Sequence, residues 1–249
     1  MHAARNGSRP DAFPSRLLFR FEEQKVLAAI FDMDGLLIDS EPLWQEAEIA
    51  VFGALGLNLT REQCLETRGR RTREIVAYWY AKRPWPTASI DEVRARLIDA
   101  VCELVRLRGQ PLPGVHAVLD LVASLGMKTA LASSSPPEII AAVLDKLGIR
   151  QRFIVTRSAE AETHGKPHPA LFLATAEQLG VAPADCLVFE DSLSGVIAAK
   201  AAGMTCVAVP DQRDAYMSEY NRKLVIADLI VPSLLDFGAQ QLAQLRGPG

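Results

Sequence analysis

The chain of 249 residues lacks the features that mark several special classes of protein. No apolar run approaches the ~18 residues that a membrane-spanning helix needs, so we expect no membrane span. Lysine and arginine number 27 against 30 acidic residues, so there is no basic surplus for the phosphate backbone of a nucleic acid. The four cysteines include no CxxC pair, and neither a disulfide framework nor a thiolate zinc site is expected.

The composition is that of an ordinary soluble protein, with 49% hydrophobic and 23% charged residues and a net charge of −3. The length fits one or two domains. Cys186 and Cys206 lie in apolar runs, as reduced core thiols of cytosolic proteins do, and we expect a cytoplasmic location. Residues 1–24 mix arginines with proline, glycine and serine and contain no apolar stretch long enough for a signal peptide. We expect them to be a loosely ordered N-terminal extension.

Short apolar runs without alternation recur along the chain, as they do in strands that are covered on both faces. They lie at residues 26–31, 128–132, 152–156, 186–189 and 206–209. Stretches with the apolar spacing of helices lie at residues 115–125, 137–147, 169–179 and 193–202. Each helical stretch ends at or near a glycine, as helix C-termini prefer. The alternation predicts an α/β fold, a parallel sheet with helices on both faces.

One interval breaks this alternation, because residues 43–110 carry helical periodicity and no convincing strand. Its clearest helices are predicted at residues 49–55, 73–79 and 93–107. The interval ends at the turn signal Pro-Leu-Pro-Gly of residues 111–114. We therefore predict a helical insert at 43–110 and a core formed by residues 25–42 and 111–249.

Two acidic residues follow directly on the first predicted strand, in the sequence Asp32-Met33-Asp34-Gly35. Residues two apart in an extended chain project the same way, so both carboxylates converge where open parallel sheets bind ligands. Two like charges about 4 Å apart repel by roughly 4 kcal/mol at an effective dielectric near 20, which a proton, a cation or a metal must offset. A plain turn after the strand is the alternative, since Asp and Gly are common turn residues.

Three later loops carry chemistry that matches these acids. The serines 133–135 follow a strand and offer hydroxyl and N–H groups to an anion, or merely an N-cap to the next helix. Lys166 lies in a proline-rich loop, where a solvated lysine is the alternative. Glu190 and Asp191 end another strand and either cap a helix or complete an oxygen-ligand cluster for Mg²⁺. Four carboxylates beside one lysine carry an excess of negative charge, which makes physical sense if a divalent cation and a phosphate bind there.

In this order, the four groups resemble the motifs of the haloacid dehalogenase-like superfamily of phosphotransferases over about residues 26–240. The segment 31–41 (FDMDGLLIDSE) is similar to the β-phosphoglucomutase and sugar-phosphatase branch. Within that branch, residues 28–44, 78–81 and 84–85 resemble the bacterial hexitol phosphatases, also described as 2-deoxyglucose-6-phosphate phosphatases. The resemblance implies a Rossmann-like core with a small α-helical cap inserted after the first strand.

The resemblance also implies a role for each motif residue. Asp32 would be the nucleophile and form an acyl phosphate. Asp34 would protonate the departing sugar oxygen and then act as the general base on water. Lys166 would stabilise charge on the nucleophile and the transferring group. Ser133, with the backbone N–H of Ser134, would hold phosphate oxygens.

A magnesium ion is implied by the same resemblance. Mg²⁺ would be held by the carboxylate of Asp32, the backbone carbonyl of Asp34 and Asp191. Glu190 would support this set from nearby. Met33, between the two aspartates, would belong to the loop that binds the substrate.

The helical insert would close over the crevice, exclude water and contact the sugar. Candidate contacts are Glu41, Trp44 and residues 68–71. Packing is the alternative for Trp44, and exposure to solvent is favoured for Arg70 and Arg71. In the mutase branch a histidine occupies the position of Trp44, and this departure favours hydrolysis over intramolecular transfer.

The sequence thus predicts a Mg²⁺-dependent phosphatase of hexose or hexitol phosphates, such as 2-deoxyglucose 6-phosphate, that acts through an aspartyl phosphate. A phosphomutase of the β-phosphoglucomutase type is the alternative within the branch. An inactive scaffold that binds phosphorylated ligands is the alternative of another class, which the intact motifs disfavour. We expect a small phosphorylated sugar as partner, no nucleic acid, no membrane and, by analogy with the branch, a monomer.

Overall fold

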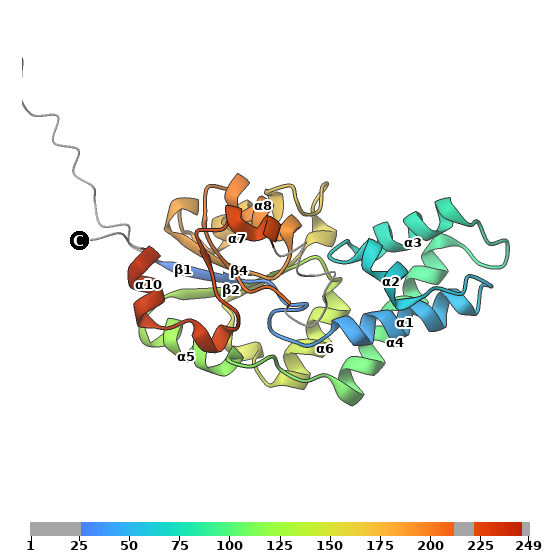
Figure 1. Cartoon of the computed structure of the whole chain (residues 1–249), viewed down its shortest axis with the longest axis horizontal. Helices are drawn as coiled ribbons and strands as arrows, with labels where there is room; N and C mark the ends of the chain where they lie inside the picture. The colour runs from blue at the N-terminus through green and yellow to red at the C-terminus, as the bar shows by residue number, and fades with distance from the viewer. Residues whose placement is uncertain (1–25, 212–221, 246–249) are drawn as a thin grey trace, which may run out of the picture.

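A six-stranded parallel sheet forms the centre of the structure, a computed structural model that describes residues 26–211 and 222–245 (Figure 1). The strand order is β3-β2-β1-β4-β5-β6, and every neighbouring pair is parallel. The strands are β1 (Ala28–Phe31), β2 (Lys128–Ser133), β3 (Val155–Ser158), β4 (Cys186–Glu190), β5 (Thr205–Ala208) and β6 (Leu229–Ile230). The expected α/β fold is confirmed, whereas the predicted extension at 1–24 lies outside the described residues.

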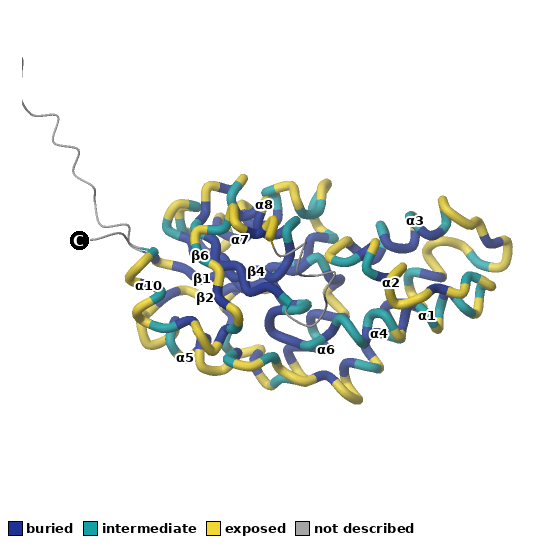
Figure 2. The backbone as a smooth tube through the Cα atoms, viewed as in Figure 1, coloured by how far each residue is buried: buried dark blue, intermediate teal, exposed yellow. Residues whose placement is uncertain are grey.

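The central strands are buried because helices cover both faces of the sheet. All four residues of β1 are buried. Ala29 and Phe31 pack into one apolar layer, and Ala28 and Ile30 pack into the other, since successive strand residues face opposite sides. Figure 2 shows the strands as a dark-blue interior, with the exposed residues on the surrounding helices and loops. Burial on both faces explains why the strands read as continuous apolar runs.

Two pairs of helices supply the two layers (Figure 1). On the side of Phe31 lie α5 (Val115–Ser124) and α6 (Pro137–Leu147), together with the short α10 (Ala239–Leu245). On the side of Ile30 lie α7 (Ala170–Leu179) and α8 (Leu193–Ala201). The glycines that follow the four longer helices, Gly126, Gly148, Gly180 and Gly203, all have a positive φ, as the C-terminal glycine signal predicts.

The segment between β1 and α5 is helical and projects from one end of the sheet (Figure 1). It contains α1 (Glu41–Gly53), α2 (Arg61–Cys64), a 3-10 turn at Leu65–Thr67, α3 (Thr72–Lys82) and α4 (Ile90–Arg108). Phe52 packs against both Trp79 and Trp85 inside it. The division into core and cap at residues 43 and 110 remains our proposal. None of the helices in the described part of the chain has both the length and the apolar character to cross a bilayer.

The structure differs from the predicted elements at three places. The strand expected at residues 152–156 begins only at Val155, because Arg150–Arg152 form a 3-10 turn after α6. The helix expected at 49–55 begins at Glu41, with a proline in its first turn. Strand β6 and helix α2, of two and four residues, are too short to leave a periodic pattern in the sequence.

The strand order places a ligand crevice beside β1. The chain passes from β1 to β2 and β3 on one side of the sheet and then to β4, β5 and β6 on the other. The connections therefore leave β1 and β4 in opposite directions, which opens a crevice at the carboxyl ends of these strands. The predicted motif residues lie at this edge.

Candidate active site

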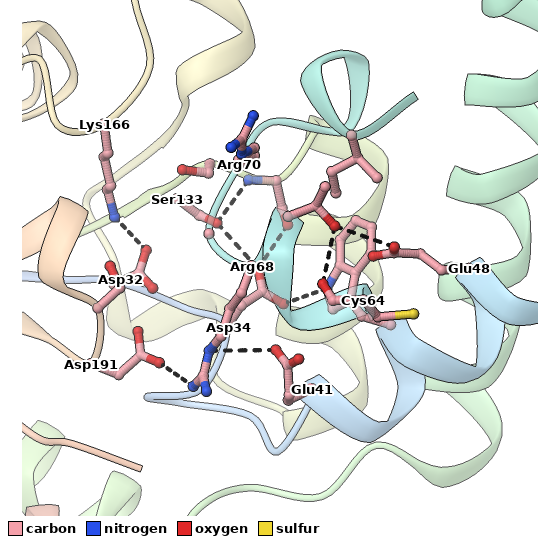
Figure 3. A pocket seen from close by; sticks show the side chains of 17 residues that line it. Asp32, Asp34, Glu41, Glu48, Cys64, Arg68, Arg70, Ser133, Lys166 and Asp191 are labelled. Atoms are coloured by element: carbon pink, nitrogen blue, oxygen red, sulfur yellow. Dashed lines mark hydrogen bonds and ion pairs between the residues drawn. The ribbon is translucent and has the colours of Figure 1, made fainter. Parts of the chain in front are cut away.

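The residues of the separate motifs meet at the carboxyl edge of the sheet, where they line one cavity together with residues of the helical insert (Figure 3). Asp32 follows β1, Ser133 ends β2 and Glu190 ends β4. Lys166, in the loop before α7, is 134 positions from Asp32 in the chain, yet its Nζ donates to Asp32 Oδ1 at 2.7 Å. The parallel arrangement of the strands brings these groups together.

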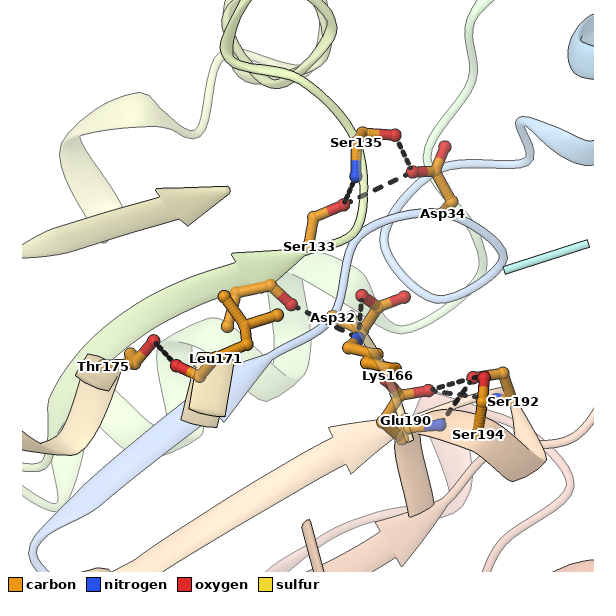
Figure 4. A network of polar contacts seen from close by, with 12 residues as sticks. Asp32, Asp34, Ser133, Ser135, Lys166, Leu171, Thr175, Glu190, Ser192 and Ser194 are labelled. Atoms are coloured by element: carbon orange, nitrogen blue, oxygen red, sulfur yellow. Dashed lines mark hydrogen bonds and ion pairs between the residues drawn. The ribbon is translucent and has the colours of Figure 1, made fainter. Parts of the chain in front are cut away.

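Three buried carboxylates surround Lys166 and form an acidic cluster. Ligand oxygens of Asp32, Glu190 and Asp191 lie within 4.8 Å of one another. Lys166 donates to both Asp32 and Glu190 (Figure 4), and its side chain is 2% exposed. Arg68 of the insert donates from Nη2 to Asp191 Oδ2 at 2.9 Å. Every acid of the cluster therefore already contacts a cationic side chain.

Burial and mutual repulsion both shift the pKa values of these groups. Burial raises the pKa of Asp32 well above its usual value; Lys166 opposes this shift, and Glu190 adds to it. Burial likewise raises the pKa of Asp191 to about 7, although Arg68 lowers it. Burial would by itself lower the pKa of Lys166, but the carboxylates of Asp32 and Glu190 outweigh it and raise the pKa. A further positive charge would thus be stabilised at this cluster.

The cluster fits a divalent cation. Mg²⁺ binds oxygen ligands at about 2.0–2.1 Å, so ligands on opposite sides of one ion lie roughly 4 Å apart. The separation of up to 4.8 Å within the cluster is close to this value. Carboxylate oxygens are hard donors and suit Mg²⁺ better than a thiophilic metal. The structure therefore supports a metal site formed by Asp32, Glu190 and Asp191, and the choice of Mg²⁺ belongs to the proposal below.

Asp34 points away from the acidic cluster, toward the end of β2 and the start of α1 (Figure 4). Its carboxylate accepts hydrogen bonds from Ser135 Oγ at 2.7 Å, from Ser40 Oγ at 2.7 Å and from Trp44 Nε1 at 3.0 Å. Ser133 Oγ lies at 3.5 Å. The two aspartates of the motif therefore have different surroundings, one beside a lysine and two acids and the other among neutral donors.

The insert contributes Arg68, which links its helices to the core. Its Nε lies 3.5 Å from Glu41 Oε2 on α1, and its Nη2 contacts Asp191 and, at 3.5 Å, Asp211. Burial raises the pKa of Glu41, although Arg68 opposes the shift. Glu41 (Figure 3) and Trp44, three positions apart on one face of α1, both line the cavity. Charged and aromatic groups of the insert thus line the cavity on that side.

Comparison with known families shows which family this fold belongs to. The profile of the haloacid dehalogenase-like hydrolases matches residues 26–203, from β1 to the end of α8. The chain belongs to this family. The match confirms the family resemblance that the four motifs indicated.

Three individual proteins are similar to this chain over most of its length. Hexitol phosphatase B of Escherichia coli (strain K12) is 41% identical over 220 residues, which are 88% of this chain and 97% of that protein. A fructose-1-phosphate phosphatase of the same organism is 33% identical and covers 75% of this chain and 97% of its own length. The crystal structure of β-phosphoglucomutase from Clostridium difficile superposes with a TM-score of 0.76 at 25% identity and covers 89% of this chain and 97% of its own. The expected enzyme class, a hydrolase of phosphoric monoesters, is confirmed.

For two motifs of this haloacid dehalogenase-like hydrolase, the alternative interpretation as a helix cap is wrong. The N-cap of α6 is Pro136 and not one of the serines 133–135; these line the cavity instead. The N-cap of α8 is Ser192, whose hydroxyl accepts from the backbone N–H of Gly195. Glu190 instead accepts hydrogen bonds from the backbone and the hydroxyl of Ser192. Neither Glu190 nor Asp191 caps the helix.

A glycine makes room for Glu190. A Cβ atom on Gly195 would lie 1.8 Å from Glu190 Oε1, well inside van der Waals contact. Glycine at the start of α8 therefore allows the helix to approach the fully buried Glu190 carboxylate. In the sequence motif Glu-Asp-Ser-x-Ser-Gly, the final position, Gly195, thus requires glycine for a steric reason.

Three of the remaining site predictions have structural outcomes. The side chain of Met33 is fully buried in the apolar layer of Phe31, so only its backbone is available to a substrate. Arg70 is exposed, as expected. The expectation of a solvated Arg71 is wrong, because its guanidinium is buried against Glu74 and the backbone carbonyl of Glu162 in the core.

Some cavity residues were missed by the sequence analysis. Ser135 was assigned no role of its own, and Glu48, Cys64 and Thr67 were not considered. Glu48 follows Glu41 by seven positions and Trp44 by four, and this spacing places all three on one face of α1. That pattern was the available signal. Cys64 and Thr67 left none, because Cys64 lies in a one-turn helix and Thr67 in the short 3-10 turn that follows it.

Proposed function

We propose that the chain is a Mg²⁺-dependent phosphatase of small sugar phosphates, hexose or hexitol phosphates such as 2-deoxyglucose 6-phosphate, acting through an aspartyl phosphate on Asp32. The observation that carries this proposal is the convergence of Asp32, Asp34, Lys166 and Asp191 in one cavity that extends to the helical insert, with the buried Glu190 beside them. The names of the two phosphatase relatives support a sugar phosphate as the substrate.

In the first step Asp32 attacks the phosphorus atom of the substrate. A bond forms between a carboxylate oxygen and phosphorus, and the bond from phosphorus to the sugar oxygen breaks. Asp34 donates its proton to the departing oxygen, so the sugar leaves as a neutral alcohol. Lys166, in contact with Asp32, stabilises the negative charge that is shared between the nucleophile and the phosphoryl group.

In the second step water attacks the phosphorus of the aspartyl phosphate. Asp34, left ionised by the first step, takes a proton from this water. The acyl-phosphate bond breaks, which releases inorganic phosphate and restores the Asp32 carboxylate. Because each step leaves Asp34 in the form that the next one needs, one carboxyl group serves both.

Residues at the ends of β2 and β4 would bind the phosphoryl group and the metal ion. Ser133 and the backbone N–H of Ser134 would hold phosphate oxygens at the edge of the cavity. Mg²⁺ would be bound by the Asp32 carboxylate, the Asp34 backbone carbonyl and Asp191, with Glu190 in support, and would supply positive charge and orientation.

The helical insert would act as a cap and exclude water from the cavity. Trp44 supports hydrolysis rather than transfer back to a sugar, because it donates to Asp34 where the mutase branch has a histidine. We also propose that the enzyme is a cytoplasmic monomer.

The decisive experiment is a screen of phosphate release from sugar phosphates by the purified chain with Mg²⁺. Hexitol phosphates, 2-deoxyglucose 6-phosphate, fructose 1-phosphate and β-glucose 1-phosphate form the panel, and the Asp32→Asn variant is the matched control. We expect phosphate release that depends on Asp32. Isomerisation of β-glucose 1-phosphate without phosphate release would establish the mutase instead, and binding without any turnover would establish an inactive scaffold.

A further inference from the structure

The cavity has two chemically different ends (Figure 3). At the end formed by the core lie Asp32, Lys166 and Asp191, which suit a phosphoryl group and a cation. At the other end, formed by the insert, lie Glu48 and Thr67. A substrate whose phosphorus atom is at Asp32 therefore directs the rest of its structure toward the insert end.

Glu48 is the charged group of that insert end. The residue is 3% exposed, and Figure 3 shows its carboxylate turned from α1 toward the cavity, on the side opposite Asp32 and Lys166. Thr67 Oγ1 donates to Glu48 Oε2 at 3.3 Å. Within residues 26–211 and 222–245, no lysine, arginine or histidine lies within ion-pair distance of it. Burial raises its pKa and outweighs the neutral side chains of Thr67 and Cys64, which lower its pKa by hydrogen bonding. Burying a carboxylate without a cationic partner is costly.

Glu41, seven positions earlier on the same face of α1, has different partners. Its carboxylate pairs with Arg68 and accepts a hydrogen bond from Gln45 at 3.0 Å. The two acids of this face therefore have different partners: Glu41 pairs with the cationic Arg68, whereas the carboxyl group of Glu48 contacts neutral groups and has about four lone-pair positions, not all of which these contacts use.

We propose that Glu48 is a specificity-determining residue, whose carboxyl group binds a hydroxyl group of the sugar chain at the insert end of the cavity. This rests on the proposed sugar-phosphatase function and deepens it, because it identifies a polyhydroxylated leaving group as the preferred substrate class. Burial raises the pKa of Glu48 to about 8, and Glu41 adds to the shift. Near neutral pH the group is therefore largely protonated, and a carboxylic acid both donates to and accepts from an alcohol.

The test compares two substrates in wild-type enzyme and three variants. One substrate is 2-deoxyglucose 6-phosphate; the other is p-nitrophenyl phosphate, whose leaving group carries no aliphatic hydroxyl. The measured quantity is the ratio of their kcat/KM values. Glu48→Leu is expected to lower this ratio about 10-fold to 100-fold, the size of one buried hydrogen bond. Glu48→Gln is expected to retain much of it, since an amide also donates and accepts.

Glu46→Gln is the matched control, because Glu46 lies on the same helix with its side chain 51% exposed and pairs with Arg108. It is expected to leave the ratio unchanged. A purely structural role of Glu48, such as holding Thr67, would lower both kcat/KM values of Glu48→Leu together and overturn the inference. An unchanged ratio would overturn it as well.

The failure of this inference is distinguishable from failure of the proposed function. A wild-type enzyme that releases phosphate from p-nitrophenyl phosphate and from no sugar phosphate would overturn the proposed function, and this inference with it, before any variant is made. A wild-type enzyme active on sugar phosphates, with a ratio that does not respond to Glu48→Leu, would overturn the role of Glu48 alone.

Discussion

The buried Glu48 makes a quantitative prediction about the pH dependence of stability, which the Glu48→Gln variant tests. The pKa of Glu48 rises from 4.5 to about 8 on folding, because burial disfavours the charged form and Glu41 repels it. Between these values the folded state keeps a proton that the unfolded state has released. Stability therefore falls as pH rises through this interval, and the penalty is complete above pH 8.

The magnitude follows from the same two values. Each pH unit in the interval costs about 1.36 kcal/mol of unfolding free energy, so the whole interval from 4.5 to about 8 costs about 5 kcal/mol. Glutamine has the shape of protonated glutamic acid and does not titrate. We therefore expect Glu48→Gln to match wild type near pH 4.5 and to be more stable by several kcal/mol at pH 9.

Urea unfolding of both proteins, measured at one-unit intervals from pH 5 to pH 9, gives the two stability curves. Their difference is expected to grow steadily up to about pH 8 and then level off. Glu46→Gln, with its half-exposed side chain on the same helix, is expected to give a curve parallel to wild type. Parallel curves for Glu48→Gln and wild type would show that the Glu48 carboxyl group is not buried from water, and would refute the reasoning.

Three further predictions concern the metal, the packing around Glu190 and the N-terminal segment. Removing divalent cations with excess chelator is expected to stop phosphate release, and added Mg²⁺ to restore it; full turnover in chelator would contradict the metal's role. Gly195→Ala is expected to cost about 1–3 kcal/mol of stability by overpacking and to weaken Mg²⁺ binding, since its Cβ would displace Glu190; urea unfolding and a Mg²⁺ titration of activity measure both, and wild-type values would contradict the steric argument. Deleting residues 1–24 is expected to leave kcat unchanged, and a large loss would show that this segment belongs to the enzyme.

The sequence predicted the sheet well because both faces of its central strands are covered. Such strands are short and uniformly apolar, as in β1 and β4, and glycines mark the ends of the helices between them. The prediction was wrong where this signal is ambiguous. Residues 152–154 resemble a strand in composition, but the turn at Arg150–Arg152 delays β3 to Val155.

The members of the site could also be predicted, because each follows a strand or precedes a helix at the same edge of a parallel sheet. Chain order and topology alone therefore bring Asp32, Lys166 and Asp191 together. Their catalytic roles remain a proposal that the experiments above test.

What the sequence by itself determined is thus which residues reach the carboxyl edge, since that depends on local spacing and strand order. Only the tertiary structure decided which partners they contact: Asp34 turns to Ser135 and Trp44, and Arg71 is buried against the core. It also decided that Glu48 is buried at the cavity. These outcomes depend on packing between segments far apart in the chain, which no local pattern of residues encodes.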